Sequence, residues 1–183
     1  MFPILETERL KLVELGYQHV QSLFEILSIE EVMRYYGSDS FTTPNEAMKL
    51  IEIFQKNYKE RRGIRWGIVL KGNKKLIGSL GLNSLLLKNK RAEIGYELHP
   101  NYWRNGFTIE AIREILRFSY NELGLNRIGA VVYPENEPSL RLLRKLGFTQ
   151  EGILRDYMYQ SKQYHDTIVL SLLKHEWEKS QEK

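Results

Sequence analysis

One segment of the chain combines residue types that could hold a phosphate group. Residues Glu93–Ala111 have the pattern of a strand that passes through a short polar loop to Gly106 and directly into a helix. The first turn of a helix carries backbone N–H groups without intrahelical partners, and it attracts anions. Gly106 lacks the Cβ that would obstruct a pyrophosphate, and Arg104 adds positive charge with several donors. The spacing indicates a site for a phosphorylated ligand, although a turn shaped by Gly106 beside a solvated Arg104 would leave the same pattern.

The elements that must position this segment follow from hydrophobic periodicity. Alternating polar and apolar residues predict seven strands, which are Arg9–Glu14, Ile64–Leu70, Lys75–Leu87, Arg91–Leu98, Arg127–Tyr133, Phe148–Gln160 and Gln163–Leu173. Apolar residues three and four apart predict five helices, which are Tyr17–Ser28, Glu30–Tyr36, Pro44–Arg61, Gly106–Leu123 and Asn136–Leu146. This order predicts an α/β (α+β) fold with a mixed, mainly antiparallel sheet of about seven strands and helices on both faces. The strand–helix–strand unit from Arg91 to Tyr133 should make its two strands parallel.

Composition restricts the classes of function. The 183 residues fit one domain, which we place at residues 1–178, followed by a polar tail at 179–183 that we expect to be disordered. The absence of cysteine excludes disulfides and a cysteine nucleophile, and it is compatible with the cytoplasm. The N-terminus does not resemble a signal peptide, and no apolar run approaches the ~18 residues of a membrane span. The net charge of +4 suits a small anionic ligand as well as a nucleic acid.

The loop then carries a resemblance to a known family. Tyr102–Ala111, preceded by Ile94–Pro100, looks like the acetyl-CoA pyrophosphate loop of the GNAT superfamily of N-acetyltransferases. Gly106 occupies the central position of that motif, whereas Trp103 and Thr108 depart from its usual first and last residues. The branch that contains the ribosomal-protein N-terminal (serine/alanine) acetyltransferases resembles this chain from end to end. The other matching segments, in order, are Leu5–Leu10, Asn136–Ser139, Lys145–Phe148, Gln150–Gly152 and Tyr164–Asp166.

The resemblance implies a binding mode for acetyl-CoA. The cofactor would lie between the strands Arg91–Leu98 and Arg127–Tyr133, which splay apart in this family. Its pantetheine arm would pair with the backbone near Leu98, and Asn136 and Ser139 would face the pantetheine and the sulfur. Its pyrophosphate would rest on the loop residues, which are Trp103, Arg104, Asn105, Gly106, Phe107 and Thr108.

An attack on a thioester requires a neutral amine, and a positioned carboxylate can remove the proton. In the strand Arg91–Leu98 the side chains of Glu93 and Glu97 share one face. Glu97 lies nearest the cofactor loop and is the predicted base, with Glu93 as second choice. Both could instead be solvated strand carboxylates.

The departing thiolate requires a hydrogen-bond donor. Ser139 matches the serine that the resemblance places in this role, and Tyr133 is the alternative. A serine in the first turn of a helix can equally cap the backbone. Without a cysteine, direct transfer in a ternary complex is expected.

The predicted function is therefore transfer of acetyl from acetyl-CoA to a primary amine, with a protein or peptide N-terminal α-amine as the expected acceptor. Polyamines, aminoglycosides and amino-acid derivatives remain open, as does a non-catalytic acyl-CoA-binding module. A nucleic-acid-binding protein rests on the basic charge alone, and neither nucleic acid nor a membrane is an expected partner. The four histidines show no metal-ligand spacing, so no metal is predicted. The sequence is compatible with a monomer or a homodimer.

Overall fold

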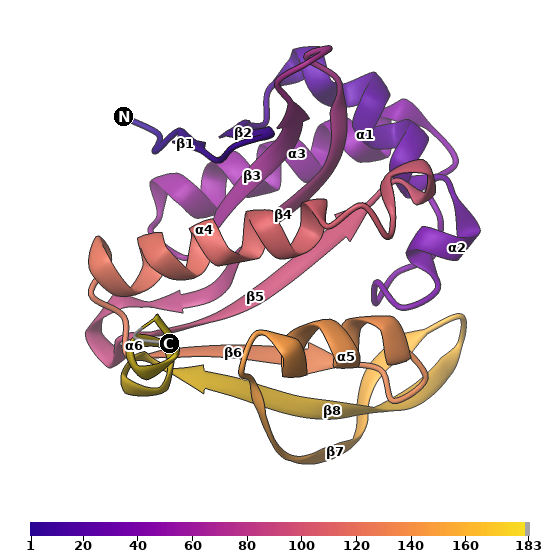
Figure 1. The fold of residues 1–183 in the computed structure, drawn as a ribbon. Coiled ribbons are helices and arrows are strands. Elements are labelled where there is room, and N and C mark those ends of the chain that lie inside the picture. The colour runs from indigo at the N-terminus through magenta and orange to yellow at the C-terminus, as the bar shows by residue number, and fades with distance from the viewer. Residues whose placement is uncertain (182–183) are drawn as a thin grey trace.

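The sheet is the organising element of the computed structural model, which describes residues 1–181 (Figure 1). Within these residues it has eight strands in the order β1-β2-β3-β4-β5-β6-β8-β7. Their bounds are β1 Leu5–Glu6, β2 Leu10–Glu14, β3 Ile64–Leu70, β4 Leu76–Leu86, β5 Arg91–Leu98, β6 Arg127–Val132, β7 Thr149–Gln160 and β8 Gln163–Leu173. Every neighbouring pair is antiparallel except β5 and β6, which are parallel. The predicted mixed, mainly antiparallel sheet is confirmed.

The parallel pair β5/β6 joins the two halves of the sheet over a short distance. Its register pairs Arg91 with Arg127, Ala92 with Ile128 and Glu93 with Gly129, and it extends no further. From there the two strands diverge (Figure 1). Backbone N–H and C=O groups beyond Glu93 on this side of β5 therefore have no partner in β6. The predicted splayed parallel pair is confirmed.

Helices cover both faces of the sheet, as predicted. In Figure 1 α4 and α5 lie in front of the sheet, whereas α1 and α3 lie behind it. The α-helices are α1 Val20–Leu27, α2 Glu30–Met33, α3 Pro44–Lys59, α4 Phe107–Asn121, α5 Glu137–Lys145 and α6 Lys174–Gln181. Three short 3₁₀ helices are η1 Tyr17–His19, η2 Leu87–Asn89 and η3 Pro100–Tyr102.

The hydrophobic core fixes α4 against the sheet. From the predicted apolar stripe of this helix, Ile112, Leu116 and Tyr120 are fully buried. Burial of each such side chain stabilises the fold by about 1.5–3 kcal/mol. A second cluster, which includes Leu23 and Ile51, packs α1 and α3 together behind the sheet. The core therefore holds the start of α4, and with it the loop at Gly106, rigidly beside the open end of β5.

Two elements differ from the sequence prediction. The sheet has eight strands and not about seven, because Leu5–Glu6 forms a short strand that pairs with β2. Residues 174–181 form α6, a helix that the polar sequence did not indicate and that includes the first residues of the expected tail. Its Trp177 packs on Tyr120, with 5.2 Å between ring centroids, and this contact explains why the segment is ordered. Residues 182 and 183 of the expected tail lie outside the described part of the chain.

Candidate active site

The loop before α4 is built to receive an anion. Gly106 is the residue before the helix and has φ +78°, a left-handed conformation that side-chain-bearing residues rarely adopt. The backbone N–H groups of Arg104, Asn105 and Gly106 have no hydrogen-bond acceptor among residues 1–181. Those of Phe107 and Thr108 belong to the first helical turn, where no intrahelical acceptor exists. Five successive N–H groups are thus free for a ligand.

Arg9 of the segment before β2 supports this loop from behind. Its Nη1 donates to the backbone oxygen of Asn105 at 3.0 Å, and its guanidinium lies 4.4 Å from the ring centre of Phe107. The same guanidinium forms an ion pair with Glu110 in the first turn of α4. Partial burial alone would raise the pKa of Glu110, but hydrogen bonds from Thr7 and Arg9 hold it below its usual value. Arg9 therefore neutralises a carboxylate that would otherwise repel an anion at the helix start.

A hollow of about 480 Å³ runs from this loop to the start of α5, and we call it the α4–α5 hollow. Six of the predicted cofactor residues line it, namely Leu98, Trp103, Arg104, Thr108, Asn136 and Ser139. The remaining three, Asn105, Gly106 and Phe107, lie at the junction of the loop with α4 and do not line the hollow. Trp103 donates its indole N–H to the Leu98 oxygen at 2.7 Å, so this carbonyl is already engaged. One of the two acceptor positions of this oxygen remains open, so pairing of a pantetheine arm near Leu98 stays a prediction.

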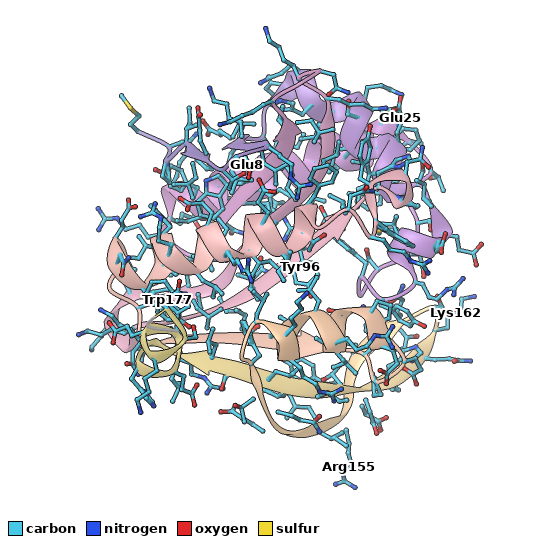
Figure 2. The ribbon with its side chains drawn as sticks, viewed as in Figure 1. Glu8, Glu25, Tyr96, Arg155, Lys162 and Trp177 are labelled. Atoms are coloured by element: carbon cyan, nitrogen blue, oxygen red, sulfur yellow. The ribbon has the colours of Figure 1, made fainter. Side chains whose placement is uncertain are left out.

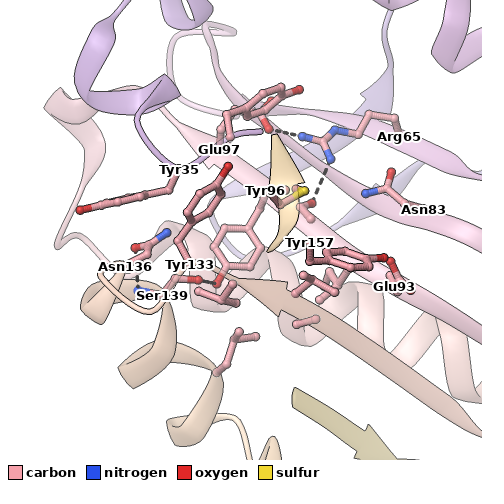
Figure 3. A pocket seen from close by; sticks show the side chains of 18 of the residues that line it. Tyr35, Arg65, Asn83, Glu93, Tyr96, Glu97, Tyr133, Asn136, Ser139 and Tyr157 are labelled. Carbon is pink, nitrogen blue, oxygen red and sulfur yellow. Dashed lines mark hydrogen bonds and ion pairs between the residues drawn. The ribbon is translucent and has the colours of Figure 1, made fainter. Parts of the chain in front are cut away.

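Ser139 faces the gap between the two halves of the sheet. Asn136 caps α5 by accepting from the Ser139 backbone N–H at 3.3 Å, so the serine hydroxyl is not used for capping. That hydroxyl lies 2.6 Å from the Tyr96 hydroxyl of β5 (Figure 3). Tyr96 points from β5 into the space between α4 and α5 (Figure 2). Burial raises the pKa of Tyr96 to about 12, so its hydroxyl stays protonated at neutral pH.

A second hollow, of about 410 Å³, lies between the diverging strands β5 and β6, and successive residues of β5 from Glu93 to Glu97 line it (Figure 3). We call it the tyrosine hollow, because Tyr35, Tyr36, Tyr96, Tyr133 and Tyr157 line it. Both hollows share six lining residues, which are Tyr35, Tyr36, Tyr96, Glu97, Asn136 and Ser139. The two hollows therefore meet where β5 and β6 have separated.

Glu97 is the one carboxylate among these shared residues. It is buried, and it accepts hydrogen bonds from Arg65 of β3 and Ser79 of β4. Burial raises the pKa of Glu97, while the Arg65 charge and the Ser79 hydroxyl oppose that rise. The predicted base is thus a buried member of an ion pair and not a solvated carboxylate.

Glu93 lies on the same face of β5, as predicted, but its surroundings differ. It is partly exposed, and it lines the tyrosine hollow but not the α4–α5 hollow. Its carboxylate has no hydrogen bond or ion pair with another residue in the described part of the chain. Glu93 is therefore a carboxylate of this hollow without a direct partner, and the opposing charge of Arg127 in β6 acts on it only at longer range.

Tyr133 is fixed by Gln160 of β7. Its hydroxyl donates to the Gln160 side-chain oxygen at 2.8 Å, and the Gly37 N–H donates to the same oxygen at 3.1 Å. The Gln160 amide nitrogen donates to the backbone oxygens of Met33 and Ser38, both at 2.8 Å. Gln160 thus fastens the loop that carries Tyr35 and Tyr36 to the other half of the sheet. The Tyr133 hydroxyl is used in this link, which leaves Ser139 as the more available donor.

Sequence reasoning missed several of these partners. Arg65 had a signal, because it is a charged residue within the otherwise apolar strand Ile64–Leu70. Arg9 lies in the Leu5–Leu10 segment that carried the resemblance, but its contact with the loop could not be read from the chain. Gln160 had no signal, since it is one polar residue at the end of a strand.

Two further observations concern metal sites and membrane-spanning helices. Within residues 1–181 no group of three or more histidine and carboxylate side chains is arranged to hold a metal ion. In the same residues no helix has the length and apolar character that crossing a membrane requires.

Comparisons with known proteins agree with this geometry. The family model of the acetyltransferase (GNAT) domain matches residues 9–149. The uncharacterized N-acetyltransferase YoaA of Bacillus subtilis (strain 168) is 48% identical to this chain, and the match covers 95% of this chain and 98% of YoaA. YdaF of the same organism, named as a candidate ribosomal N-acetyltransferase, is 32% identical over 92% of this chain and 87% of its own.

The fold also matches solved structures. The crystal structure of spermidine N-acetyltransferase from Vibrio cholerae, in complex with CoA and spermine, has a TM-score of 0.81. That protein is 22% identical to this chain, and the match covers 93% of this chain and 99% of the other. At this identity the likeness concerns the fold.

Proposed function

Because the chain belongs to the GNAT family of acetyl-CoA-dependent N-acetyltransferases, we propose that its acceptor is a primary amine at the N-terminus of a protein or peptide. An α-amine has a pKa near 8, about two units below that of a lysine side chain, so less free energy is needed to deprotonate it. The similarity to YdaF, whose name refers to ribosomal acetylation, supports a protein acceptor.

The observation that carries this proposal is the meeting of two hollows at Glu97 and Ser139. The α4–α5 hollow reaches Arg104 and Thr108, at the two ends of the run of free N–H groups before α4, and such groups suit the pyrophosphate of acetyl-CoA. The tyrosine hollow lies between β5 and β6 and suits an amine. When bound, acetyl-CoA supplies an activated acetyl group. We propose that the acetyl group and the amine approach each other from the two hollows, which supports direct transfer in a ternary complex.

We propose Glu97 as the base, acting directly or through a water molecule. Each carboxylate oxygen has two acceptor positions, and Arg65 and Ser79 occupy one on each oxygen. A further acceptor position remains on each. Because burial raises its pKa, Glu97 is a stronger base than a solvated carboxylate. Glu93, the second choice, is better placed to attract the incoming ammonium group.

We propose Ser139 as the donor to the departing thiolate. Tyr96 stays protonated and lies 2.6 Å away, so it can donate to the serine oxygen. The serine proton is then free to point toward the sulfur. Tyr133 is the weaker candidate, because its hydroxyl already donates to Gln160.

The test combines binding and turnover. Calorimetry with CoA should show binding, and release of free thiol from acetyl-CoA should depend on an added peptide with a free N-terminus. Glu97→Gln should lower kcat by about 10²-fold, the usual contribution of a general base. Ser79→Ala is the comparison variant. It removes the hydrogen bond from Ser79 to Glu97 but keeps the Glu97 carboxylate.

The outcomes separate the alternatives. Binding of CoA without turnover of any amine would favour a non-catalytic acyl-CoA module, and turnover of polyamines or aminoglycosides alone would favour a small-molecule acetyltransferase. No binding of CoA would overturn the proposal. A cytoplasmic location and a monomeric or homodimeric state remain predictions, for which fractionation and light scattering are the measurements.

A further inference from the structure

We propose that the tyrosine hollow selects an amine with a single positive charge, carried on an aromatic or large apolar group. This inference rests on the proposed function and names the acceptor class of the same site. For a peptide acceptor, it means an N-terminal residue with a large apolar or aromatic side chain.

The first argument is the charge of the hollow. Its charged lining residues are Arg65, Glu93 and Glu97. Each nitrogen of the Arg65 guanidinium makes one hydrogen bond, since the group donates to Ser79 Oγ at 2.8 Å, to the Gly95 oxygen at 3.0 Å and to Glu97. The side chains of Arg65 and Glu97 are 6% and 3% exposed, so this pair is internal and neutral as a whole. One carboxylate of the hollow remains without a direct partner, that of Glu93, because the nearby Arg127 is already paired with Glu151.

A single carboxylate matches a single ammonium group. A polyamine carries several ammonium groups, and each one that leaves water without a partner costs several kcal/mol. The other two carboxylates nearby, Glu31 and Glu135, line the α4–α5 hollow, where Arg34 and Arg104 are also present. They are therefore not part of the surface that receives the amine.

The second argument is the aromatic surface. Apart from Tyr96 and Tyr133, which are hydrogen-bonded to other side chains, the rings of Tyr35, Tyr36 and Tyr157 and that of Phe54 line the hollow. Aromatic rings attract a cation through their faces and pack against apolar groups. Tyr157 is 52% exposed, so it has free surface for an acceptor. A small or polar substituent would leave this surface in water.

The experiment compares acceptors of matched length by their kcat/KM in the thiol-release assay. The peptides share one sequence and begin with Phe, Ser or Lys, and phenethylamine is compared with spermidine. We expect the Phe peptide to exceed the Ser and Lys peptides by about tenfold, and phenethylamine to exceed spermidine by at least as much. Equal rates for Phe and Ser peptides, or a preference for spermidine, would overturn the inference and leave the acetyltransferase assignment intact.

Variants of this protein connect the preference to the hollow. Tyr157→Ala should remove most of the preference for the Phe peptide, whereas Tyr157→Phe should retain it because the ring remains. Glu93→Gln should raise KM for every amine by about threefold to fivefold without changing KM for acetyl-CoA. Glu25→Gln, on the exposed surface of α1, is the control and should change neither.

Binding measured without chemistry keeps the inference testable in an inactive protein. The same amines are titrated into protein saturated with CoA. The order of affinity should be the order predicted for kcat/KM, and any other order would contradict the inference. A protein that binds the amines in this order but shows no turnover would contradict the proposed catalysis alone.

Discussion

The hydroxyl groups of Tyr96 and Ser139 lie 2.6 Å apart and connect β5 to the start of α5. They do so where the two strands of the parallel pair have already separated, because the register of β5 with β6 ends at Glu93. The hydrogen bond therefore crosses the opening in which the thioester would lie. A side-chain contact thus spans the two halves of the sheet at the proposed reaction centre.

Removal of the serine hydroxyl should slow the chemical step. We expect Ser139→Ala to lower kcat by about 10²-fold with little change in KM for acetyl-CoA, because the donor acts on the developing thiolate. Tyr96→Phe should have a smaller effect, since it only orients Ser139. Ser28→Ala, an exposed serine of the N-terminal region, is the control. Steady-state kinetics decide the matter, and an unchanged kcat in Ser139→Ala would exclude the serine as donor.

Arg9 should affect the cofactor and not the acceptor. In Arg9→Ala, the Asn105 carbonyl loses its donor and Glu110 is left as an unpaired charge at the start of α4. We expect KM for acetyl-CoA to rise about tenfold, which corresponds to about 1.4 kcal/mol of lost binding. Lys11→Ala removes an exposed ion pair with Glu6 on the next strand and should have no such effect. A rise in the acceptor KM alone would contradict the assigned role of Arg9.

Removing only one partner of the Arg65–Glu97 ion pair should lower the stability of the fold. Replacing Arg65 with Met leaves the Glu97 carboxylate buried without its partner, and we expect a loss of about 3–5 kcal/mol in the free energy of unfolding. The double variant Arg65→Met/Glu97→Leu should recover part of that loss, because no charge remains. Urea denaturation measures both. Arg117→Met, which breaks exposed ion pairs, should cost less than about 1 kcal/mol.

Replacing Gln160 with glutamate, which has the same shape, should destabilise the fold. In Gln160→Glu a carboxylate would face the backbone oxygens of Met33 and Ser38, to which the amide now donates. We expect a loss of about 2 kcal/mol in the free energy of unfolding and a raised acceptor KM, because the loop carrying Tyr35 is released. Gln163→Glu, on the exposed side of the same hairpin, is the matched control. Equal behaviour of the two variants would mean that Gln160 does not hold the loop.

The ion pair between Arg127 and Glu151 predicts a dependence of stability on pH. Hydrogen bonds from Arg127, and then from Ser171, lower the pKa of Glu151 from 4.5 to about 2. Because the folded pKa is depressed, the stabilisation is complete above about 4.5 and is lost as the pH falls toward 2. Both side chains are partly exposed, so the effect should be below about 1 kcal/mol. The difference in unfolding free energy between wild type and Glu151→Gln should therefore vanish at low pH, and a constant difference would contradict this assignment.

Most of the fold was readable from the sequence because its elements carry strong local signals. The helix start at Thr43 is an example, since its backbone N–H donates to the Glu46 carboxylate at 2.8 Å in the pattern that the residue types favour. Gly124 and Gly147 end α4 and α5 in the left-handed conformation that only glycine adopts freely. Helix α6 was missed because its order depends on one distant contact of Trp177 with Tyr120.

The site could be predicted only in part, because it too depends on contacts between residues that are distant in the sequence. Strand alternation put Glu93 and Glu97 on one face of β5, and the unbroken register of β5 with β4 from Glu93 to Leu98 keeps them there. Their different environments depend on Arg65 and Ser79, which come from other strands and meet Glu97 only in the folded sheet. No local pattern could have indicated that one carboxylate is paired and the other free.

The short pairing between β5 and β6 also separates the proposed cofactor site from part of the proposed acceptor site. The loop before α4 and its support from Arg9 belong to the half that contains β1–β5. Tyr157, on the outer wall of the tyrosine hollow, comes from the hairpin β7/β8 at the far edge of the other half. If the proposed sites hold, substitutions on that hairpin would change which amine is accepted and leave the proposed diphosphate site unchanged. Related chains would then acquire new acceptors while keeping one way of binding the coenzyme.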